Sequence, residues 1–336
     1  MTVQLTIIGL GQIGASVGLS LANQQDQITR LGHDRDPNIA RHAQGLGAVD
    51  KIVFNLPSSV ENAELVILAL PFDQIRDTLQ VVGPFLQENA VVMDTSPLKN
   101  KVAEWAKEFL PANCHYVGLI PALNPLYLRM EEKGTSSAHA DLFSGGLMGV
   151  TAPQGTSGAA IKLASDLASL LGASPLYVDL VEADGLMASI HLVPQLTAAI
   201  LANLAMDRPG WKDARKLTGR LFSEVTLPVQ EAEENSSLVA MSIYNNENVA
   251  RVLDEMIVSL EELRDYVKGS ENEKLFELLE HARSGRSKWW QERKKGDWLS
   301  LDKEQLGIIK GNLWNRLFGD MGKLFGPPQK KGDDRK

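Results

Sequence analysis

The sequence predicts an α/β protein, with a Rossmann-like, doubly wound N-terminal domain followed by an all-α helical domain. Three observations support this prediction. A β-rich run at residues 3–8 leads directly into a glycine pattern, apolar runs alternate with helical stretches as far as about residue 150, and long helical segments dominate after that. We expect domains at residues 1–155 and 156–288 and a separate tail at 289–336, because 336 residues suit two domains.

The strands of the first domain are expected where short runs are continuously apolar or β-branched, as in a parallel sheet that is covered on both faces. These runs are residues 3–8, 28–33, 64–70, 90–93 and 147–150. Helices are expected between them at residues 38–46, 72–86 and 100–110. This alternation of strands and helices is typical of a doubly wound parallel sheet.

The second domain is expected to consist mostly of long helices. The periodic segments are residues 159–171, 182–206, 214–233, 238–268 and 272–288, with one strand at 174–178. The part at 185–206 carries no charge and is long enough to cross a membrane, but it includes His191, Pro194 and Gln195. We therefore expect a buried helix or a helix in the core of a dimer.

Cysteine content and net charge limit the function. The single cysteine, Cys114, allows no disulfide within the chain, and the first residues predict a strand instead of a secretory signal. We therefore expect a cytoplasmic protein. Residues 1–285 carry 21 basic against 35 acidic side chains, a net charge of −14. This charge argues against a nucleic-acid partner, because phosphate binding needs clustered Lys and Arg.

The C-terminal tail has the opposite charge. Residues 286–336 carry 13 basic against 7 acidic side chains, a net charge of +6, and hold four of the six tryptophans. Apolar residues recur every three or four positions from Leu306 to Phe325, which predicts an amphipathic helix. Such a helix could pack on the acidic body, contact a partner subunit, or lie on an anionic membrane surface. The sequence leaves these alternatives open.

A dinucleotide site is predicted from the glycine turn that follows the first strand. Gly9 permits a tight turn, Gly11 lets the backbone approach a pyrophosphate, and Gly14 lets the next helix pack on the strand. The N-terminus of that helix offers N–H groups to the phosphate charge. The other residues of this predicted cofactor turn are Leu10, Gln12 and Ile13.

Further cofactor contacts are predicted at the ends of other strands. Asp34, which lies 20 residues past Gly14, is expected to bind the adenosine ribose and to favour NAD. The adjacent Arg35 could reach a phosphate, so NADP stays an alternative. Two strand ends are expected to frame the nicotinamide, because ligands bind at the carboxyl edge of such sheets. They are Leu70 and Pro71 at one strand and Asp94, Thr95 and Ser96 at the next.

Several motifs together carry a resemblance to a known family. They are GLGQIGASVGLSLA, ELVILALP, DTSPLK, DLFSGGLMGVTAP and GASPLYVDLVEADGLMASIHLVPQL, in this order within residues 3–285. In combination they resemble the prephenate/arogenate dehydrogenase family. The resemblance implies a helical dimerisation domain and hence a homodimer. It also implies NAD(P)-dependent oxidation of prephenate or arogenate, coupled to decarboxylation, in tyrosine biosynthesis, without a metal.

The sequence departs from the family where the resemblance implies substrate contacts, so we expect a divergent member. The family's catalytic histidine is replaced by Ile120, or by Asn124 if a short insertion is allowed. Other expected residues differ as well. Pro97 stands for a serine, Leu192 and Gln195 stand for two histidines, and Leu227 stands for an arginine.

Three residues are the main candidates for the missing catalytic groups: Asn124, His191 and Ser96. His191 lies one position from a family histidine, about 100° around the helix, so it would face the substrate only if the helix were rotated. Other candidates are His115, His139 and Tyr127, with Arg129 as a carboxylate anchor. Two alternative functions stay open, namely a paralogue that acts on another small acid and a non-catalytic NAD(P)-binding regulatory or scaffold protein.

Overall fold

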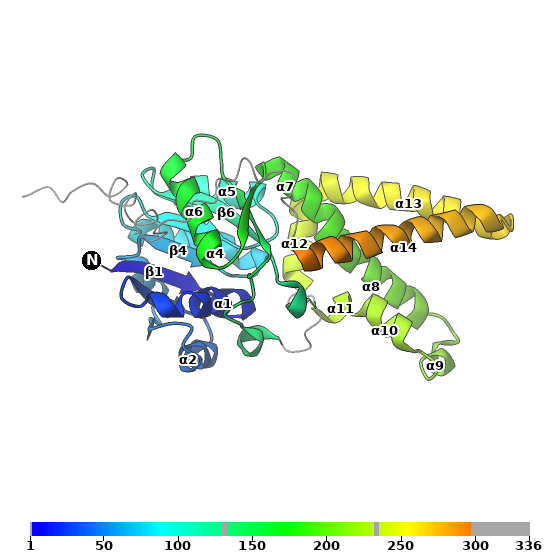
Figure 1. The fold of residues 1–336 in the computed structure, drawn as a ribbon, viewed down its shortest axis with the longest axis horizontal. Helices are drawn as coiled ribbons and strands as arrows, with labels where there is room; N and C mark the ends of the chain where they lie inside the picture. The colour runs from blue at the N-terminus through cyan, green and yellow to red at the C-terminus, as the bar shows by residue number, and fades with distance from the viewer. Residues whose placement is uncertain (1, 129–132, 232–234, 297–336) are drawn as a thin grey trace, which may run out of the picture.

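The computed structural model describes residues 2–128, 133–231 and 235–296. A sheet domain forms one end of the molecule, and a bundle of helices extends from it (Figure 1). The hairpin of α13 (Asn246–Lys268) and α14 (Asn272–Lys295) reaches furthest. The expected class of fold, a doubly wound sheet followed by a helical domain, is confirmed.

The sheet has eight strands in the order β3-β2-β1-β4-β5-β6-β7-β8, and every neighbouring pair is parallel except β6 with β7. The strands are β1 Val3–Ile8, β2 Ile28–His33, β3 Lys51–Ile52, β4 Leu65–Leu68, β5 Val91–Asp94, β6 His115–Ala122, β7 Leu147–Thr151 and β8 Ser174–Tyr177. All six predicted strands are present, and β3 and β6 add to them. The order reverses direction between β1 and β4, which is where dinucleotides bind in doubly wound sheets.

Helices cover both faces of the sheet. They are α1 Gln12–Ser20, α2 Pro37–Gly45, α3 Leu56–Val60, α4 Phe72–Val82, α5 Asn100–Phe109 and α6 Gly158–Leu170. Successive residues of a strand point to opposite faces of the sheet, so their side chains pack into two separate hydrophobic cores. Leu5 and Ile7 pack with α1, α2 and α6, whereas Val66 and Leu68 pack with α4 and α5. The second core also takes in residues of the helical domain, so that domain docks on the α4 and α5 face.

The predicted domain boundary at residue 155 falls inside this sheet domain. Helix α6 supplies buried residues to the first core, and β8 pairs in parallel with β7. The sequence predicts the helical domain from residue 156 because the pattern becomes mostly helical there, but the strand after the first of these helices returns to the sheet. We propose that the boundary lies between Tyr177 and Leu180.

The helical domain runs from α7 to α14. Its elements are α7 Leu180–Met187, a π-helical turn Ala188–Leu192, α8 Val193–Met206, α9 Trp211–Ala214, α10 Arg220–Thr226, α11 Pro228–Glu231, α12 Asn235–Tyr244, α13 Asn246–Lys268 and α14 Asn272–Lys295. The helix predicted at 182–206 is one continuous helical run. The single helix predicted at 214–233 is wrong, since two short helices, α10 and α11, occupy its described part after α9 ends at Ala214. The helix predicted at 238–268 breaks at Asn245.

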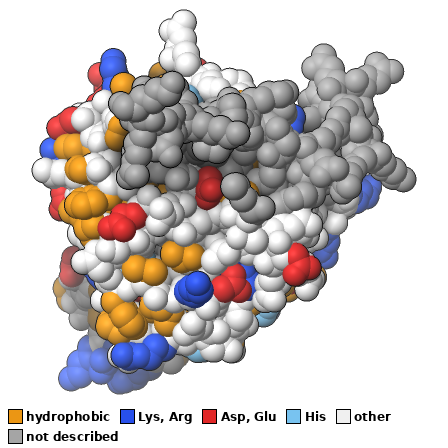
Figure 2. Space-filling view, turned by 90° about the vertical axis from the view of Figure 1, so that its left-hand side faces the viewer, with side chains coloured by type: hydrophobic (Ala, Val, Ile, Leu, Met, Phe, Trp, Pro, Cys, Tyr) orange, Lys and Arg blue, Asp and Glu red, His pale blue; other side chains and the backbone are white. Residues whose placement is uncertain are grey.

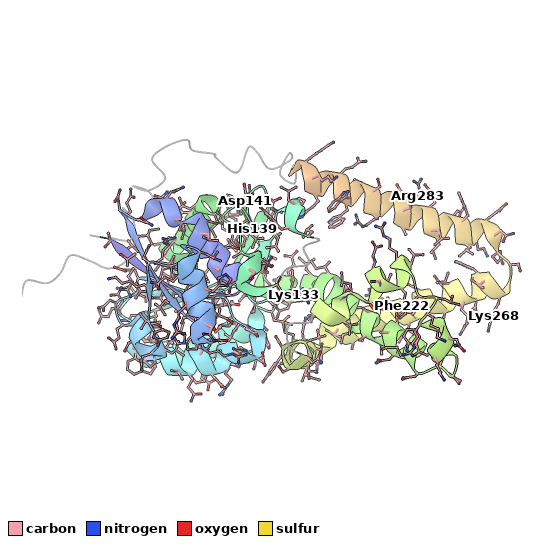
Figure 3. The ribbon with its side chains drawn as sticks, turned by 90° about the horizontal axis from the view of Figure 1, so that it is seen from below. Lys133, His139, Asp141, Phe222, Lys268 and Arg283 are labelled. Atoms are coloured by element: carbon pink, nitrogen blue, oxygen red, sulfur yellow. The ribbon has the colours of Figure 1, made fainter. Side chains whose placement is uncertain are left out.

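The first residues of the predicted tail belong to α14, which continues to Lys295. Near its end Arg293 is buried and donates a hydrogen bond to the carbonyl of Leu123, so this end of α14 packs on the sheet domain. In Figure 3, α14 runs from the hairpin tip near Lys268 past Arg283 toward the sheet domain. Residues 297–336, including the predicted amphipathic helix, lie outside the described residues.

The run from α7 to α8 is the one helix in the described residues that is long and apolar enough to cross a membrane by length and composition. Only 28% of its apolar window is buried inside the chain. Of the two expected arrangements, a buried helix or a helix in the core of a dimer, this low burial within one chain favours the second. Ile190, Ile200 and Leu204 remain exposed on it, and an apolar surface of this kind is what a partner subunit covers. The far end of the sheet domain differs, with acidic and basic side chains interspersed among apolar ones (Figure 2).

Candidate functional site

The glycine turn has the geometry that a dinucleotide requires. Gly9 has a φ of +89°, and a Cβ there would lie 2.3 Å from the carbonyl oxygen of Ala69. A Cβ on Gly14 would lie 1.9 Å from the carbonyl oxygen of Gly9, so only glycine lets α1 start this close to β1. A Cβ on Gly11 would meet no atom within 4 Å. The open space at Gly11 leaves room for a pyrophosphate at the N-terminus of α1.

A cavity of about 240 Å³ lies beside this turn on the β2 side. Asp34 lines it, and its carboxylate is held in place by the backbone N–H of Leu10 (2.8 Å) and that of Asp36 (2.9 Å). Arg35 lies in the same wall. The cavity suits an adenosine whose ribose hydroxyls face the carboxylate. The lining residues are Ile8, Gly9, Gly11, His33, Asp34, Arg35, Ile39, Leu56, Ala69, Leu70, Pro71, Gln74 and Thr78.

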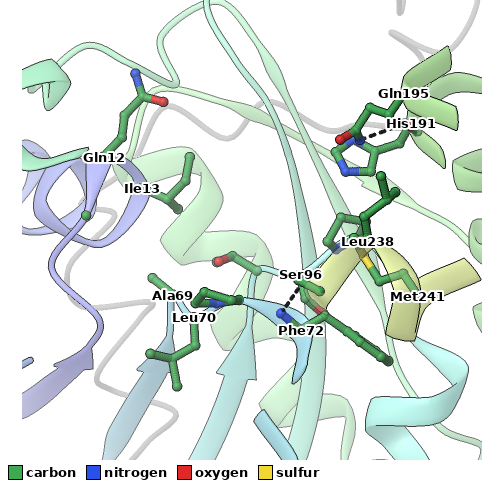
Figure 4. A pocket seen from close by; sticks show the side chains of 15 residues that line it. Gln12, Ile13, Ala69, Leu70, Phe72, Ser96, His191, Gln195, Leu238 and Met241 are labelled. Atoms are coloured by element: carbon green, nitrogen blue, oxygen red, sulfur yellow. Dashed lines mark hydrogen bonds between the residues drawn. The ribbon is translucent and has the colours of Figure 1, made fainter. Parts of the chain in front are cut away.

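A second cavity, of about 310 Å³, lies between the carboxyl ends of the strands and the helical domain (Figure 4). It shares Gly11, Ala69, Leu70 and Pro71 with the first, so the two cavities form adjoining parts of one groove. The sheet domain contributes Gly11, Gln12, Ile13, Ala69, Leu70, Pro71, Phe72, Thr95, Ser96 and Pro97. The helical domain contributes His191, Gln195, Ser237, Leu238 and Met241.

Most of the predicted cofactor residues therefore line the groove. Three of them, Leu10, Gly14 and Asp94, do not line the groove but support residues that do. Leu10 is buried and holds Asp34 through its N–H, and Gly14 allows the close approach of α1. Asp94 is buried beneath Ser96.

Asp94 is the centre of a buried hydrogen-bond network at the end of β5. Its Oδ2 accepts hydrogen bonds from the Ser96 hydroxyl (2.6 Å), the Ser96 N–H (2.8 Å) and Lys99 Nζ (2.8 Å). Its Oδ1 accepts from the Tyr116 hydroxyl (2.6 Å). Because the Ser96 hydroxyl gives its hydrogen to Asp94, its oxygen keeps lone pairs with which it can accept a further hydrogen bond at the cavity.

Burial shifts the ionisation of two members of this network. Desolvation lowers the pKa of Lys99, against the opposing charge and hydrogen bond of Asp94. Desolvation, together with the charge and hydrogen bond of Asp94, raises the pKa of Tyr116 well above its ordinary value. Tyr116 is therefore a neutral donor, and the contact between Lys99 and Asp94 is a fully buried ion pair.

His191 lies on the opposite wall of the second cavity, on the π-helical turn between α7 and α8. This turn holds one residue more than an α-helical turn and so changes which side chains face the sheet domain; such turns are frequent at functional sites. His191 lines the cavity, whereas Leu192, at the position of a family histidine, is fully buried in the core. His191, and not Leu192, therefore faces the cavity.

The ionisation of His191 suits a proton acceptor. Desolvation lowers the pKa of the imidazole, so the ring is neutral near pH 7. Gln195 Nε2 donates to the backbone carbonyl of His191 (2.9 Å), which ties the two residues together across the turn (Figure 4). A neutral imidazole in a cavity beside a cofactor groove can serve as a general base.

The third catalytic candidate, Asn124, does not line the cavity. Its side chain accepts a hydrogen bond from the N–H of Leu126 (3.1 Å) and donates to the carbonyl of Asp141 (3.2 Å), so it supports the loop after β6. The hydroxyl of Tyr127 also donates to Asp141 (2.6 Å), and the ring stacks on His139 at 4.4 Å. Figure 3 shows His139 and Asp141 in this loop.

The remaining candidates also lie away from the second cavity. Ile120 is paired with Gly149 inside the sheet, His115 begins β6, and Leu227 follows α10 with its side chain partly exposed. Arg129 lies outside the described residues.

No pattern in the sequence indicates the contribution of α12. Ser237, Leu238 and Met241 line the cavity, and the Ser237 hydroxyl accepts the N–H of Phe72 at the start of α4 (3.0 Å). Ser237 lies 165 positions after Phe72 in the chain, and no local pattern indicates such a contact. Among the described residues no group of three or more His, Cys, Asp or Glu side chains is arranged to hold a metal.

The fold and this groove define a nicotinamide-dinucleotide-dependent dehydrogenase with a separate helical domain. Two family models match the chain: the nucleotide-binding domain of prephenate dehydrogenase over residues 17–176 and its dimerization domain over residues 181–281. The chain belongs to the prephenate dehydrogenase family. The second match supports assembly into a homodimer through the helical domain.

Individual relatives agree with this assignment. The chain is 24% identical over 290 residues to prephenate dehydrogenase from Bacillus subtilis, covering 84% of this chain and 75% of that protein. It is 22% identical over 284 residues to cyclohexadienyl dehydrogenase from Zymomonas mobilis, covering 84% and 94%.

Solved structures share the fold. Prephenate dehydrogenase from A. aeolicus, in complex with hydroxyphenyl propionate and NAD+, superposes with a TM-score of 0.75 at 21% identity, covering 86% of this chain and 98% of that chain. Synechocystis arogenate dehydrogenase superposes with a TM-score of 0.68 at 21% identity, covering 85% and 99%.

Proposed function

We propose that this protein is an NAD(P)-dependent dehydrogenase that oxidises prephenate or arogenate, with decarboxylation, in tyrosine biosynthesis. The observation that carries the proposal is the second cavity, where neutral His191 and the hydroxyl of Ser96 lie on walls from different domains at the end of a dinucleotide groove. Family membership supports the reaction class. We also propose that the protein is cytoplasmic and that NAD is preferred, because Asp34 would repel a 2′-phosphate.

The residues of the groove would have separate roles in cofactor binding and in proton transfer. The turn from Gly9 to Gly14 would bind the pyrophosphate and Asp34 the ribose, and the bound nicotinamide would supply the hydride acceptor. His191 would take the proton of the ring hydroxyl as hydride leaves the same carbon. The Ser96 oxygen, whose own hydrogen is given to Asp94, would serve as a hydrogen-bond acceptor beside the reacting ring. Closure of the cavity by α8 and α12 would limit the access of water.

The reaction can be tested by following the absorbance of reduced nicotinamide with prephenate and with arogenate, each with NAD and with NADP. The expected result is turnover of at least one acid, with NAD used more efficiently. No reduced cofactor with either acid would contradict the proposal.

A second candidate, oxidation of a less highly charged small acid, is favoured by the lining of the second cavity. Among its described lining residues none is Lys, Arg, Asp or Glu, and the one ionisable side chain is His191, which is neutral near pH 7. A dianionic acid would meet no fixed cation there, and an unpaired charge is costly to bury. Turnover of a mono-acid cyclohexadienol in preference to prephenate and arogenate would favour this candidate.

A further inference from the structure

Asp184 lies in α7 of the helical domain, but its side chain makes its hydrogen bonds with the sheet domain. It is 7% exposed. One carboxylate oxygen accepts the N–H of Lys99 (2.7 Å), and the other accepts the N–H of Asn100 (3.2 Å). These groups start α5, which has no capping hydrogen bond from the side chain at its own N-cap position. The free N–H groups of a helix start need such an acceptor, and here the other domain supplies it.

From the start of α5 the contacts lead to one wall of the second cavity. The side chain of Lys99 is fully buried and binds Asp94, and Asp94 in turn accepts the hydroxyl of Ser96. A change at the backbone of Lys99 therefore reaches Ser96 through two short polar contacts.

Asp184 is also connected to the opposite wall. It precedes His191 by seven residues in the same continuous helical run. Its backbone carbonyl accepts a hydrogen bond from Asn245 Nδ2 (2.8 Å), at the end of α12. Helix α12 carries Ser237 and Met241 of the cavity lining. Asp184 is thus connected to His191 through its own helical run and to α12 through Asn245.

We propose that Asp184 is a positioning residue, which docks the helical domain on the start of α5 so that His191 and Ser96 face the same cavity. The inference rests on the proposed function for its kinetic consequence, but the docking itself does not depend on the substrate. Asp184 touches neither the groove nor its lining and acts through Lys99 and through its own helix.

A negative charge is tolerated at this buried position for identifiable reasons. Burial raises the pKa of Asp184, while the two backbone hydrogen bonds and the charge of Lys99 oppose that rise. The start of α5 adds the favourable end of a helix dipole. An uncharged residue of similar size would keep the packing and lose part of this attraction.

The chain offers a matched control at Asp179. This aspartate also accepts two backbone N–H groups, those of Val181 (2.8 Å) and Glu182 (3.3 Å), but it caps its own helix and is exposed. The comparison of Asp184→Ala with Asp179→Ala separates docking from the general loss of a helix cap. Asp184→Asn retains one oxygen acceptor, so it should lie between Asp184→Ala and the wild type.

The test measures kcat, the Kd for NADH, and hydrogen exchange of the full-length protein. Asp184→Ala is expected to lower kcat by about 100-fold, because misplacement of reacting groups by about 1 Å costs this much. The Kd for NADH should change less than about twofold, since the predicted dinucleotide contacts lie on the sheet domain. Exchange should accelerate at Lys99 and Asn100 in Asp184→Ala and stay unchanged there in Asp179→Ala.

Two results would overturn the inference. One is unchanged kcat and exchange in a folded Asp184→Ala protein. The other is an equal loss of kcat and of NADH affinity, which indicates general damage to the fold. If Asp184→Ala does not fold, the same comparison is made with Asp184→Asn. If the wild type oxidises none of the acids, the proposed function fails, and exchange with NADH binding still decides whether Asp184 docks the domains.

Discussion

His191 and Leu192 are neighbours in the chain but face different surroundings: the imidazole lines the second cavity, and the leucine is fully buried in the core shared by the two domains. Both residues lie in the π-helical turn between α7 and α8. Leu192, which stands where the resemblance implies a histidine, therefore stabilises the domain contact, and the ionisable group moves to the adjacent position. The catalytic role of His191 stays a prediction that kinetics can test.

We expect His191→Gln to lower kcat/KM by roughly 100-fold or more, the usual contribution of a general base. Because burial lowers the pKa of His191, its proton-accepting form persists below the ordinary value of 6.5. Activity of the wild type should therefore decline on the acid side only below that value, and the decline should disappear in the variant. A pH profile of kcat/KM for both proteins measures this.

His115→Gln is the matched control, since burial also lowers the pKa of His115, which lies at the start of β6 and not in the second cavity. The control should keep the profile of the wild type. An unchanged profile in His191→Gln would remove His191 from the mechanism.

Two glycines of the cofactor turn should respond differently to alanine. Gly14→Ala is expected to destabilise the fold by about 1–3 kcal/mol, because the new Cβ would lie 1.9 Å from the carbonyl oxygen of Gly9. Gly11→Ala has free space around its Cβ, so its melting temperature should fall much less, while NADH affinity should fall because the methyl group occupies the pyrophosphate space. Thermal unfolding and NADH titration measure both effects.

The control for the glycine series is Gly45→Ala, at the end of α2 with no atom within 4 Å of its Cβ. It should alter neither melting temperature nor NADH affinity. Normal NADH affinity in Gly11→Ala would contradict the assignment of the pyrophosphate site.

Local patterns predicted the parts of the protein that local sequence determines. The structure has a strand at 3–8 and places Gly9, Gly11 and Asp34 around one cavity, because strand period, glycine geometry and spacing are properties of neighbouring residues. The boundary predicted at 155 does not take account of the pairing of β8 with β7, because that pairing is a long-range contact. The partnership of Asp184 with Lys99 spans 85 residues and has no local pattern.

The assignment of Asn124 to catalysis shows a different limit. The sequence of an asparagine before a proline does not distinguish a residue that caps a short turn from one that binds a substrate. In the structure the Asn124 side chain accepts a hydrogen bond from the N–H of Leu126. In the same way, the spacing of apolar residues does not indicate the π turn at Ala188–Leu192, and so it does not predict which face of the helix the His191 side chain occupies.

The ion pair of Arg30 and Asp50 should make stability depend on acid pH. Arg30 is 1% exposed and binds Asp50 at 2.6 Å. Burial raises the pKa of Asp50, but hydrogen bonds and charge from Arg30 outweigh this and leave it below the ordinary value of 3.8. The contribution is therefore complete above that value and is lost as pH falls through the lower pKa of the folded state.

We expect Asp50→Asn to cost about 1–3 kcal/mol of unfolding free energy near pH 7, the range for a hydrogen bond to a charged group. The difference from the wild type should shrink below about pH 4, where Asp50 of the unfolded wild type becomes protonated. Urea unfolding over a pH series measures it. Asp26→Asn, at an exposed site, is the control and should lie near the wild type throughout. A difference that does not change with pH would exclude the charge of Asp50 as its source.

The exposed apolar face of α8 should hold two subunits together. Ile200 is 60% exposed in the single chain and lies in the segment that matches the family's dimerization domain. In Ile200→Asp a subunit contact would bury an unpaired carboxylate, which we expect to weaken association by on the order of 3 kcal/mol, or about 100-fold in Kd. Sedimentation at several concentrations measures the change. Leu46→Asp, on the sheet domain and 44% exposed, should leave the assembly intact. A dimer that is unaffected by Ile200→Asp would place the subunit contact on another face. The exposed surface of α13 and α14 would then be the next to change.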